Sequence, residues 1–196
     1  LISRDLPTGF VAVNNVSYID NNRILIIGQA PYLILKKKTN RTCGRAVVVD
    51  NTGNVLTDVY LGEDGSDLYC GQVLKDGSVI LGGMEPRVGG TRAGMIGKVD
   101  SKGKVIYKYL SDESGPCVGF EVLGSSTEYV HVAFTGEDGA PASVVRLDNK
   151  GKPFFVTNLP DRGFHINKIL TAPDDHIFLI GNSMGNGGRV LKIRAE

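Results

Sequence analysis

Three arginines in glycine-rich segments have the most informative chemistry in this chain. Arg87 and Arg92 lie in the segment 85–94, and Arg162 lies in the segment 158–165. A guanidinium group holds a carboxylate, sulfate or phosphate through two parallel hydrogen bonds. Two or three converging arginines therefore predict an anion-binding surface. Because single surface charges contribute little and acidic residues stand in neighbouring segments, a solvated, charge-balanced surface is the alternative.

Tyr32 and His165 extend the same candidate surface. Tyr32 belongs to the segment 29–45, the longest stretch between apolar runs, and a long loop in a compact domain often carries function. A tyrosine ring can pack against a sugar while its hydroxyl group forms hydrogen bonds. The chain has no tryptophan and 7% aromatic residues, which weakens the case for a glycan partner relative to a protein partner.

Polar side chains recur one residue before an apolar position in four similar segments. They are Asn15, Gln72, Glu121 and Lys168. If the four segments surround a common axis, these side chains form a polar ring that can hold an ion or water. The alternative is that Glu121 and Lys168 neutralise each other, because buried charges need a partner.

Neither a metal nor a cofactor is predicted. His131, His165 and His176 stand in different sequence contexts, so they do not resemble a metal-binding triad. The glycine-rich segment 181–188 lacks the strand-to-helix context of a phosphate-binding loop.

Repeated phrases indicate the elements that position these residues. An aspartate stands three residues before a glycine at Asp50, Asp100 and Asp148. Asp at the first and Gly at the fourth position are typical of a type I turn, and apolar β-formers flank each copy. Each copy is therefore predicted to be the tip of a β-hairpin.

A second type of hairpin alternates with these tips. Its four copies are the segments 14–28, 71–83, 120–134 and 167–181. One repeat then holds four short strands in about 49 residues, a quarter of the 196-residue chain. This pattern predicts an all-β fold with a single domain over residues 1–196, a four-bladed β-propeller of four-stranded antiparallel blades. A β-sandwich is the alternative.

The last repeat contains its first hairpin and the strand 189–194, and no hairpin tip follows. Leu1–Leu6 precede the first hairpin without a partner of their own. We expect this N-terminal strand to close the last blade, which would cover an otherwise open sheet edge.

The best-defined repeat runs from Asp50, Gly53 and Val55 through "LGEDGSD" (61–67) to "LKDGSVILGG" (74–83). It resembles the repeats of secreted bacterial β-propeller proteins, although those usually carry a tryptophan after the turn. The resemblance covers most of the chain and implies the architecture only. It does not imply one function, because adhesins, scaffolds and enzymes share such repeats. We separately expect an extracellular or surface-exposed location.

The charge balance limits the partners. Lys plus Arg number 22 and Asp plus Glu 21, a net charge of +1, so we expect no nucleic-acid partner. Apolar runs such as 24–27 are too short to insert into a membrane. Cys43, Cys70 and Cys117 lack CxxC spacing, and either three free thiols or one disulfide fits, with Cys70 and Cys117 as a conceivable pair.

These observations favour a non-enzymatic recognition domain. It would present a loop-rich face to a protein or glycan partner, as part of a secreted, phage or surface assembly. No catalytic residue is assigned. The alternative is a glycoside hydrolase in which Glu121 works with Asp112, Glu113 or Asp161, because glycosidases need two carboxylates at a suitable separation.

Overall fold

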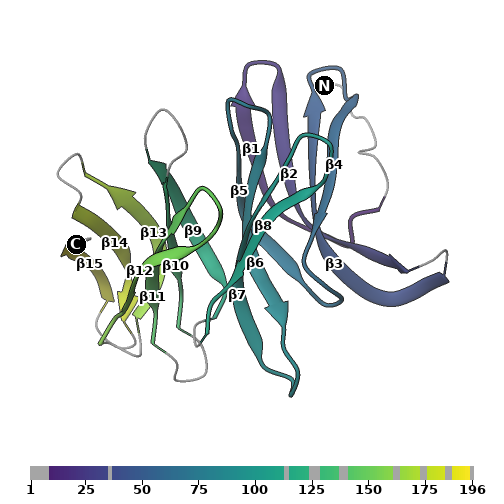
Figure 1. Cartoon of the computed structure of the whole chain (residues 1–196). Helices are drawn as coiled ribbons and strands as arrows, with labels where there is room; N and C mark the ends of the chain where they lie inside the picture. Colours follow the sequence, from purple (N-terminus) through teal and green to yellow (C-terminus); the bar gives the residue numbers. More distant parts are fainter. Residues whose placement is uncertain are drawn as a thin grey trace.

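The computed structural model describes eight stretches of the chain, residues 9–34, 37–112, 115–123, 129–136, 141–160, 164–172, 176–183 and 187–194. The side chains of residues 32–41 and of residue 123 are outside that description. Within the described stretches the chain forms fifteen antiparallel β-strands in four sheets, so the predicted all-β class is confirmed (Figure 1). The same stretches hold no helix long and apolar enough to cross a membrane.

The strands follow chain order within each sheet. The first sheet contains β1 (Ala12–Asp20), β2 (Arg23–Ile34), β3 (Lys37–Asp50) and β4 (Val55–Leu61). The second contains β5 (Asp67–Val73), β6 (Val79–Pro86), β7 (Arg92–Val99) and β8 (Val105–Leu110). The third contains β9 (Cys117–Leu123), β10 (Tyr129–Phe134), β11 (Ser143–Asp148) and β12 (Pro153–Asn158). The fourth contains β13 (Phe164–Thr171), β14 (His176–Ser183) and β15 (Gly187–Arg194).

The four sheets form a row. The first strand of each sheet contacts the first strand of the next, in the order β1, β5, β9 and β13. The first and fourth sheets lie at opposite ends of the row (Figure 1), and their described strands share no contact comparable to those between consecutive sheets. The expected closing strand, Leu1–Leu6, falls outside the described residues. The described residues therefore form four sheets in sequence, and these residues by themselves do not close a ring.

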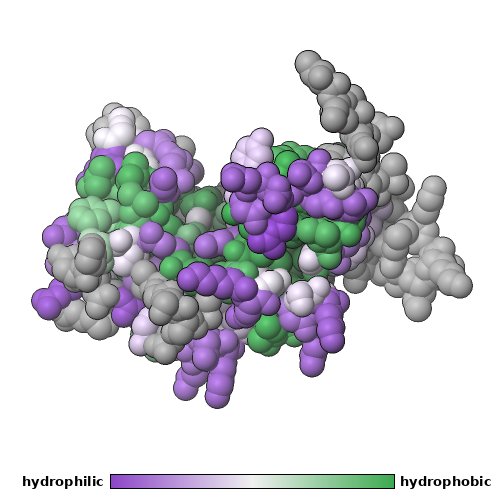
Figure 2. All heavy atoms as spheres, turned by 90° about the horizontal axis from the view of Figure 1, so that it is seen from above, coloured by the Kyte–Doolittle hydropathy of each residue, from purple (hydrophilic) through white to green (hydrophobic). Residues whose placement is uncertain are grey.

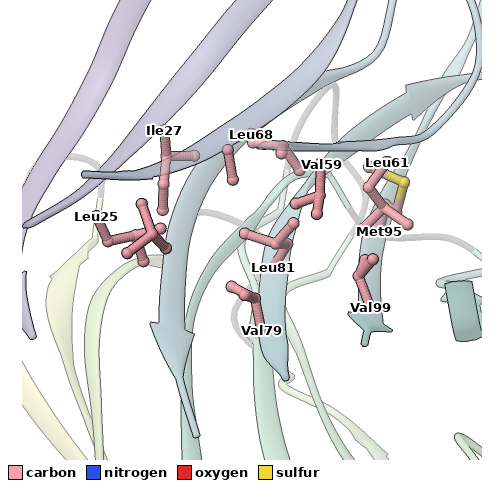
Figure 3. Packing of buried hydrophobic residues seen from close by; sticks show 11 residues of the cluster. Leu25, Ile27, Val59, Leu61, Leu68, Val79, Leu81, Met95 and Val99 are labelled. Atoms are coloured by element: carbon pink, nitrogen blue, oxygen red, sulfur yellow. The ribbon is translucent and has the colours of Figure 1, made fainter. Parts of the chain in front are cut away.

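Apolar layers between consecutive sheets hold the row together. Leu25 and Ile27 of the first sheet meet Leu68 and Leu81 of the second, and all four side chains are at most 1% exposed (Figure 3). The neighbouring strand positions point to the other face, because side chains alternate along a strand. Similar buried clusters join the second sheet to the third and the third to the fourth. Hydrophobic burial between faces thus holds consecutive sheets together.

A β-bulge recurs at the same place in all four sheets. In the first, second and fourth sheets, a glycine on the second strand pairs with the residue that precedes the bulge: Gly28, Gly83 and Gly181. A Cβ atom at these glycines would lie only 1.9–2.0 Å from a carbonyl oxygen of the first strand. The third sheet has Phe134 at this position. The close approach of two backbones explains why three of the four hairpins end in glycine.

The predicted hairpin tips have one geometry. The Asp50 carboxylate accepts hydrogen bonds from the backbone N–H groups of Thr52 (2.9 Å) and Asn54 (2.8 Å). Asp100 and Asp148 accept the corresponding pairs of backbone bonds. The glycine that completes the first tip, Gly53, has a φ of 87°, which favours glycine. The Asp-x-x-Gly phrase therefore has a structural role.

Asp50 should titrate far below an ordinary aspartate. The hydrogen bond from the Thr52 hydroxyl group, with those from Asn54, lowers the pKa of Asp50 to about 2. A depressed folded-state pKa means that the tip's contribution to stability is complete above the ordinary value of 3.8 and is lost as the pH falls toward 2. Carboxyl-carbon NMR titration measures this midpoint, and Thr52→Ala should raise it. A midpoint at 3.8 in the unmodified chain would contradict the interpretation.

Candidate ligand-binding site

A pocket of about 250 Å³ lies between the second and third sheets. Its lining is mixed in character and comprises Tyr109, Ser111, Asp112, Ser143, Val145, Pro153, Val156 and Asn158. Figure 2 shows the molecule from above, where hydrophobic groups form separate patches among hydrophilic side chains. Small-molecule sites combine apolar and aromatic side chains with a few polar groups, and this pocket has residues of both kinds.

Backbone pairing positions the polar groups of the pocket. Ser111 follows the last residue of β8, and its hydroxyl group accepts a hydrogen bond from the backbone N–H of Gly94 (3.0 Å). Its own backbone N–H donates to the Gly94 carbonyl group (2.8 Å). Across the pocket, Ser143 at the start of β11 pairs with Asn158 at the end of β12. The polar groups therefore stand at matching ends of two neighbouring sheets.

Arg87 fastens the loop that carries Asp112. The guanidinium group of Arg87 donates to the carbonyl oxygens of Ser111 and Asp112, the latter at 2.7 Å. It thus links the turn after β6 to the segment after β8. These hydrogen bonds use backbone carbonyl oxygens, so they do not occupy the Asp112 carboxylate. Asp112 is exposed and lines the pocket. Arg87 thus positions this loop, and its predicted role in ligand binding stays a prediction.

Tyr109 supplies the aromatic surface of the pocket. Its half-buried ring lies 6.2 Å, centroid to centroid, from the fully buried ring of Phe134. Burial raises the pKa of Tyr109, the Asp112 charge adds to this, and Arg87 acts in the opposite direction. The phenol consequently stays neutral over the physiological range and can donate a hydrogen bond.

The other predicted surface residues do not join this pocket. Arg92 is exposed, and its Nη1 atom lies 3.2 Å from the sulfur atom of Met84. His165 is half-buried on β13 and pairs with Asn182. The Tyr32 side chain and Arg162 lie outside the described residues.

The predicted polar ring is staggered. Gln72 pairs with Ile80 and Glu121 pairs with His131, at matching levels of the second and third sheets. Both belong to the third residue pair after the bulge, whereas Asn15 and Lys168 belong to the first pair after the bulge of their own sheets. Asn15 donates to the Tyr69 carbonyl group at 3.3 Å. Among the described residues, the ion pairs do not include one between Glu121 and Lys168.

The sequence analysis did not predict a row of polar side chains beside Glu121, in which His131 is buried and Arg146 and Thr171 are half-buried. The Nε atom of Arg146 donates to Nε2 of His131 at 2.5 Å, and Nδ1 of His131 lies 2.9 Å from the Thr171 hydroxyl group. Because arginine only donates, Nε2 of His131 accepts and its Nδ1 carries the proton. The Arg146 guanidinium group also lies over the rings of Tyr129 and Phe154. These residues come from separate strands, so no local sequence signal links them.

Of the four carboxylates in the hydrolase alternative, the structure describes Glu121 and Asp112, and it places them in different surroundings. Glu121 lies in register with His131, whose side chain contacts Thr171 of the fourth sheet. Asp112 instead lines the pocket between the second and third sheets. Glu113 and Asp161 lie outside the described residues. Within the described part of the chain, no three His, Cys, Asp or Glu side chains are arranged to hold a metal ion.

Comparisons with known proteins leave the family open. No family model matches the chain, and no curated protein matches it. A solved structure of a mannose phosphorylase from Leishmania mexicana, MPT-4, in complex with a phosphate ion, is 16% identical with a TM-score of 0.47. The alignment covers 91% of this chain and 66% of the phosphorylase chain. The fold and the pocket therefore define this molecule as an all-β protein of four antiparallel sheets with a pocket between two of them.

Proposed function

We propose that this chain is a non-enzymatic recognition domain that binds a glycan or protein partner through the pocket between the second and third sheets. The observation that carries the proposal is that Tyr109, Asp112 and Asn158, an aromatic, an acidic and an amide residue, line one hollow. Arg87 fixes the loop of Asp112 in advance, and preorganised groups bind at lower entropic cost.

A single sugar unit suits this pocket best among the partners considered. Its volume of about 250 Å³ lies just below the range of roughly 300–1,000 Å³ that encloses drug-sized ligands. The ring of Tyr109 offers a face for the apolar side of a sugar, and Asp112 and Asn158 can bind its hydroxyl groups. On a protein partner, a polar side chain would make the same contacts.

Screening of the unmodified chain tests this function. A glycan array with a heparin panel identifies candidate ligands, and NMR chemical-shift mapping locates them. We expect the largest shifts at Tyr109, Asp112 and Asn158. Binding that leaves these three residues unshifted would refute the site. We expect no turnover of aryl glycosides, whereas turnover abolished by Glu121→Gln would support the hydrolase alternative instead.

We also propose that the four sheets are the blades of a β-propeller and that Leu1–Leu6 pair with β15. Two features support this: consecutive sheets stack face to face, and the fourth sheet has three described strands where the others have four. NMR cross-peaks between the backbones of residues 1–6 and 187–194 would be expected, with those between β7 and β8 as the positive control. If only the control peaks appear, the ring is not closed in this way.

We further propose that the chain is extracellular or surface-exposed. The proteins whose repeats it resembles are secreted, and this supports the proposal. Fractionation of source cells, with detection of the chain in the medium or on the surface, tests this location. Recovery from the cell interior alone would contradict it.

A further inference from the structure

Two cysteines from neighbouring sheets lie next to each other. Cys70 is on β5 and Cys117 is on β9, and their sulfur atoms are 3.9 Å apart. Both are free thiols in the structure. A disulfide bond requires a sulfur separation of about 2.0 Å, so the two atoms need to approach by about 2 Å, a change within reach of side-chain rotation. The first strands of the two sheets are already in contact, and the backbones need not be brought together from a distance.

Gly82 leaves the space in which the two sulfur atoms meet. Gly82, on β6, pairs in register with Cys70 on the adjacent strand β5. A Cβ atom at Gly82 would lie 2.6 Å from the sulfur of Cys70 and 2.6 Å from that of Cys117. The backbone of Gly82 does not have a positive φ, so backbone conformation gives no reason for glycine here. The two sulfur atoms occupy the space that a side chain at this position would need.

We propose that Cys70 and Cys117 form a reversible disulfide that joins the first strands of the second and third sheets, with oxidised glutathione or a similar small disulfide as the oxidant. The bond would lie in the same sheet–sheet layer that carries the ligand pocket. It would couple the redox state of the surroundings to the rigidity of that layer.

The different exposure of the two thiols sets the order of the steps. Cys70 is half-buried, whereas Cys117 is 0% exposed. The Cys70 thiolate attacks one sulfur of oxidised glutathione, the glutathione S–S bond breaks, and the leaving glutathione thiolate takes up the proton that Cys70 released. Cys117 then loses its proton and attacks the Cys70 sulfur of the mixed disulfide. The second glutathione leaves with that proton, so one oxidised glutathione becomes two glutathione molecules.

The second step should be slow and should accelerate with pH. Burial, with a smaller effect of the hydrogen bond and charge of Cys70, raises the pKa of the Cys117 thiol well above its usual value. Because only the thiolate attacks, the rate of ring closure should increase about tenfold for each pH unit between pH 7 and 9.

The test is thiol counting on the full chain after incubation with oxidised glutathione at alkaline pH. Alkylation of the denatured product should label one cysteine, identified as Cys43 by peptide mass, and the intact mass should fall by two hydrogen atoms. Cys43 is a suitable internal reference because it is buried on β3, and burial raises its pKa to about 11. The oxidised chain should also melt about 5–10 °C higher, because the bond closes a long loop.

Matched variants distinguish this pairing from other oxidation. Cys43→Ser should still lose two thiols, whereas Cys70→Ser should retain both of its thiols. Three alkylated cysteines in the unmodified chain after prolonged oxidation would overturn the proposal. A disulfide that includes Cys43, or a mixed disulfide at Cys70 with Cys117 still alkylated, would overturn it as well.

Discussion

Replacing Gly83 with alanine should lower the free energy of unfolding by about 3–5 kcal/mol. The added Cβ atom would lie 1.9 Å from the carbonyl oxygen of Asp67 and 2.8 Å from the Cα atom of Leu68. Both are backbone atoms of the neighbouring strand, so no side-chain rotation can make room. The bulge of the second sheet must therefore open, which would disturb Leu68, a fully buried residue between the first two sheets.

Urea or thermal unfolding of purified protein measures this effect. Gly188→Ala is the matched control, because Gly188 on β15 has no heavy atom within 4 Å of the added Cβ position and no positive φ. The control should change the stability by no more than about 0.5 kcal/mol. Equal effects of the two substitutions would show that the close backbone approach at Gly83 is not what requires glycine.

Replacing Asp112 with asparagine should weaken binding of the ligand found in the screen by about 10- to 100-fold. The substitution keeps the size of the side chain and removes its charge, and a hydrogen bond to a charged group contributes roughly 1.5–3 kcal/mol. Asp112 is exposed, so the fold should tolerate the change. Titration calorimetry gives the affinity, and thermal unfolding verifies that the stability is unchanged.

Three further variants distinguish binding in the pocket from binding to charged groups elsewhere on the surface. Arg87→Ala should weaken binding less than Asp112→Asn, because it removes the hydrogen bonds to Ser111 and Asp112 and leaves the carboxylate in place. Arg92→Ala and Asp64→Asn should leave the affinity unchanged, since neither residue lines the pocket. If Arg92→Ala proves as harmful as Asp112→Asn, the ligand binds to the arginine surface rather than in the pocket.

The pocket and the thiol pair belong to one layer of the molecule. Ile96 and Val132 pack in the cluster between the second and third sheets, and Cys117 belongs to the same cluster. Tyr109 packs against this cluster from the pocket. The two proposals nevertheless fail separately, because thiol counting does not depend on a ligand and the binding screen can be run on the reduced chain.

Local sequence patterns determined the strands and the turns of this protein. Alternating or continuous apolar runs, divided by the Asp-x-x-Gly phrase, predicted an all-β chain because strand periodicity and turn chemistry act over a few residues. The hydrogen bonds from Thr52 and Asn54 to Asp50 confirm the turn interpretation. The glycines that end three hairpins were visible in the sequence, but their cause, a carbonyl oxygen of the adjacent strand, was not.

Only the tertiary structure decided which side chains meet. Tyr109 and Asn158 line one pocket from different sheets, and Cys70 approaches Cys117 across 47 positions of sequence. The predicted ring was staggered because matching levels depend on register and on the length of each hairpin, which apolar patterns leave unspecified. Contacts between sheets arise from the packing of whole faces, and no short stretch of sequence encodes the partner of a face.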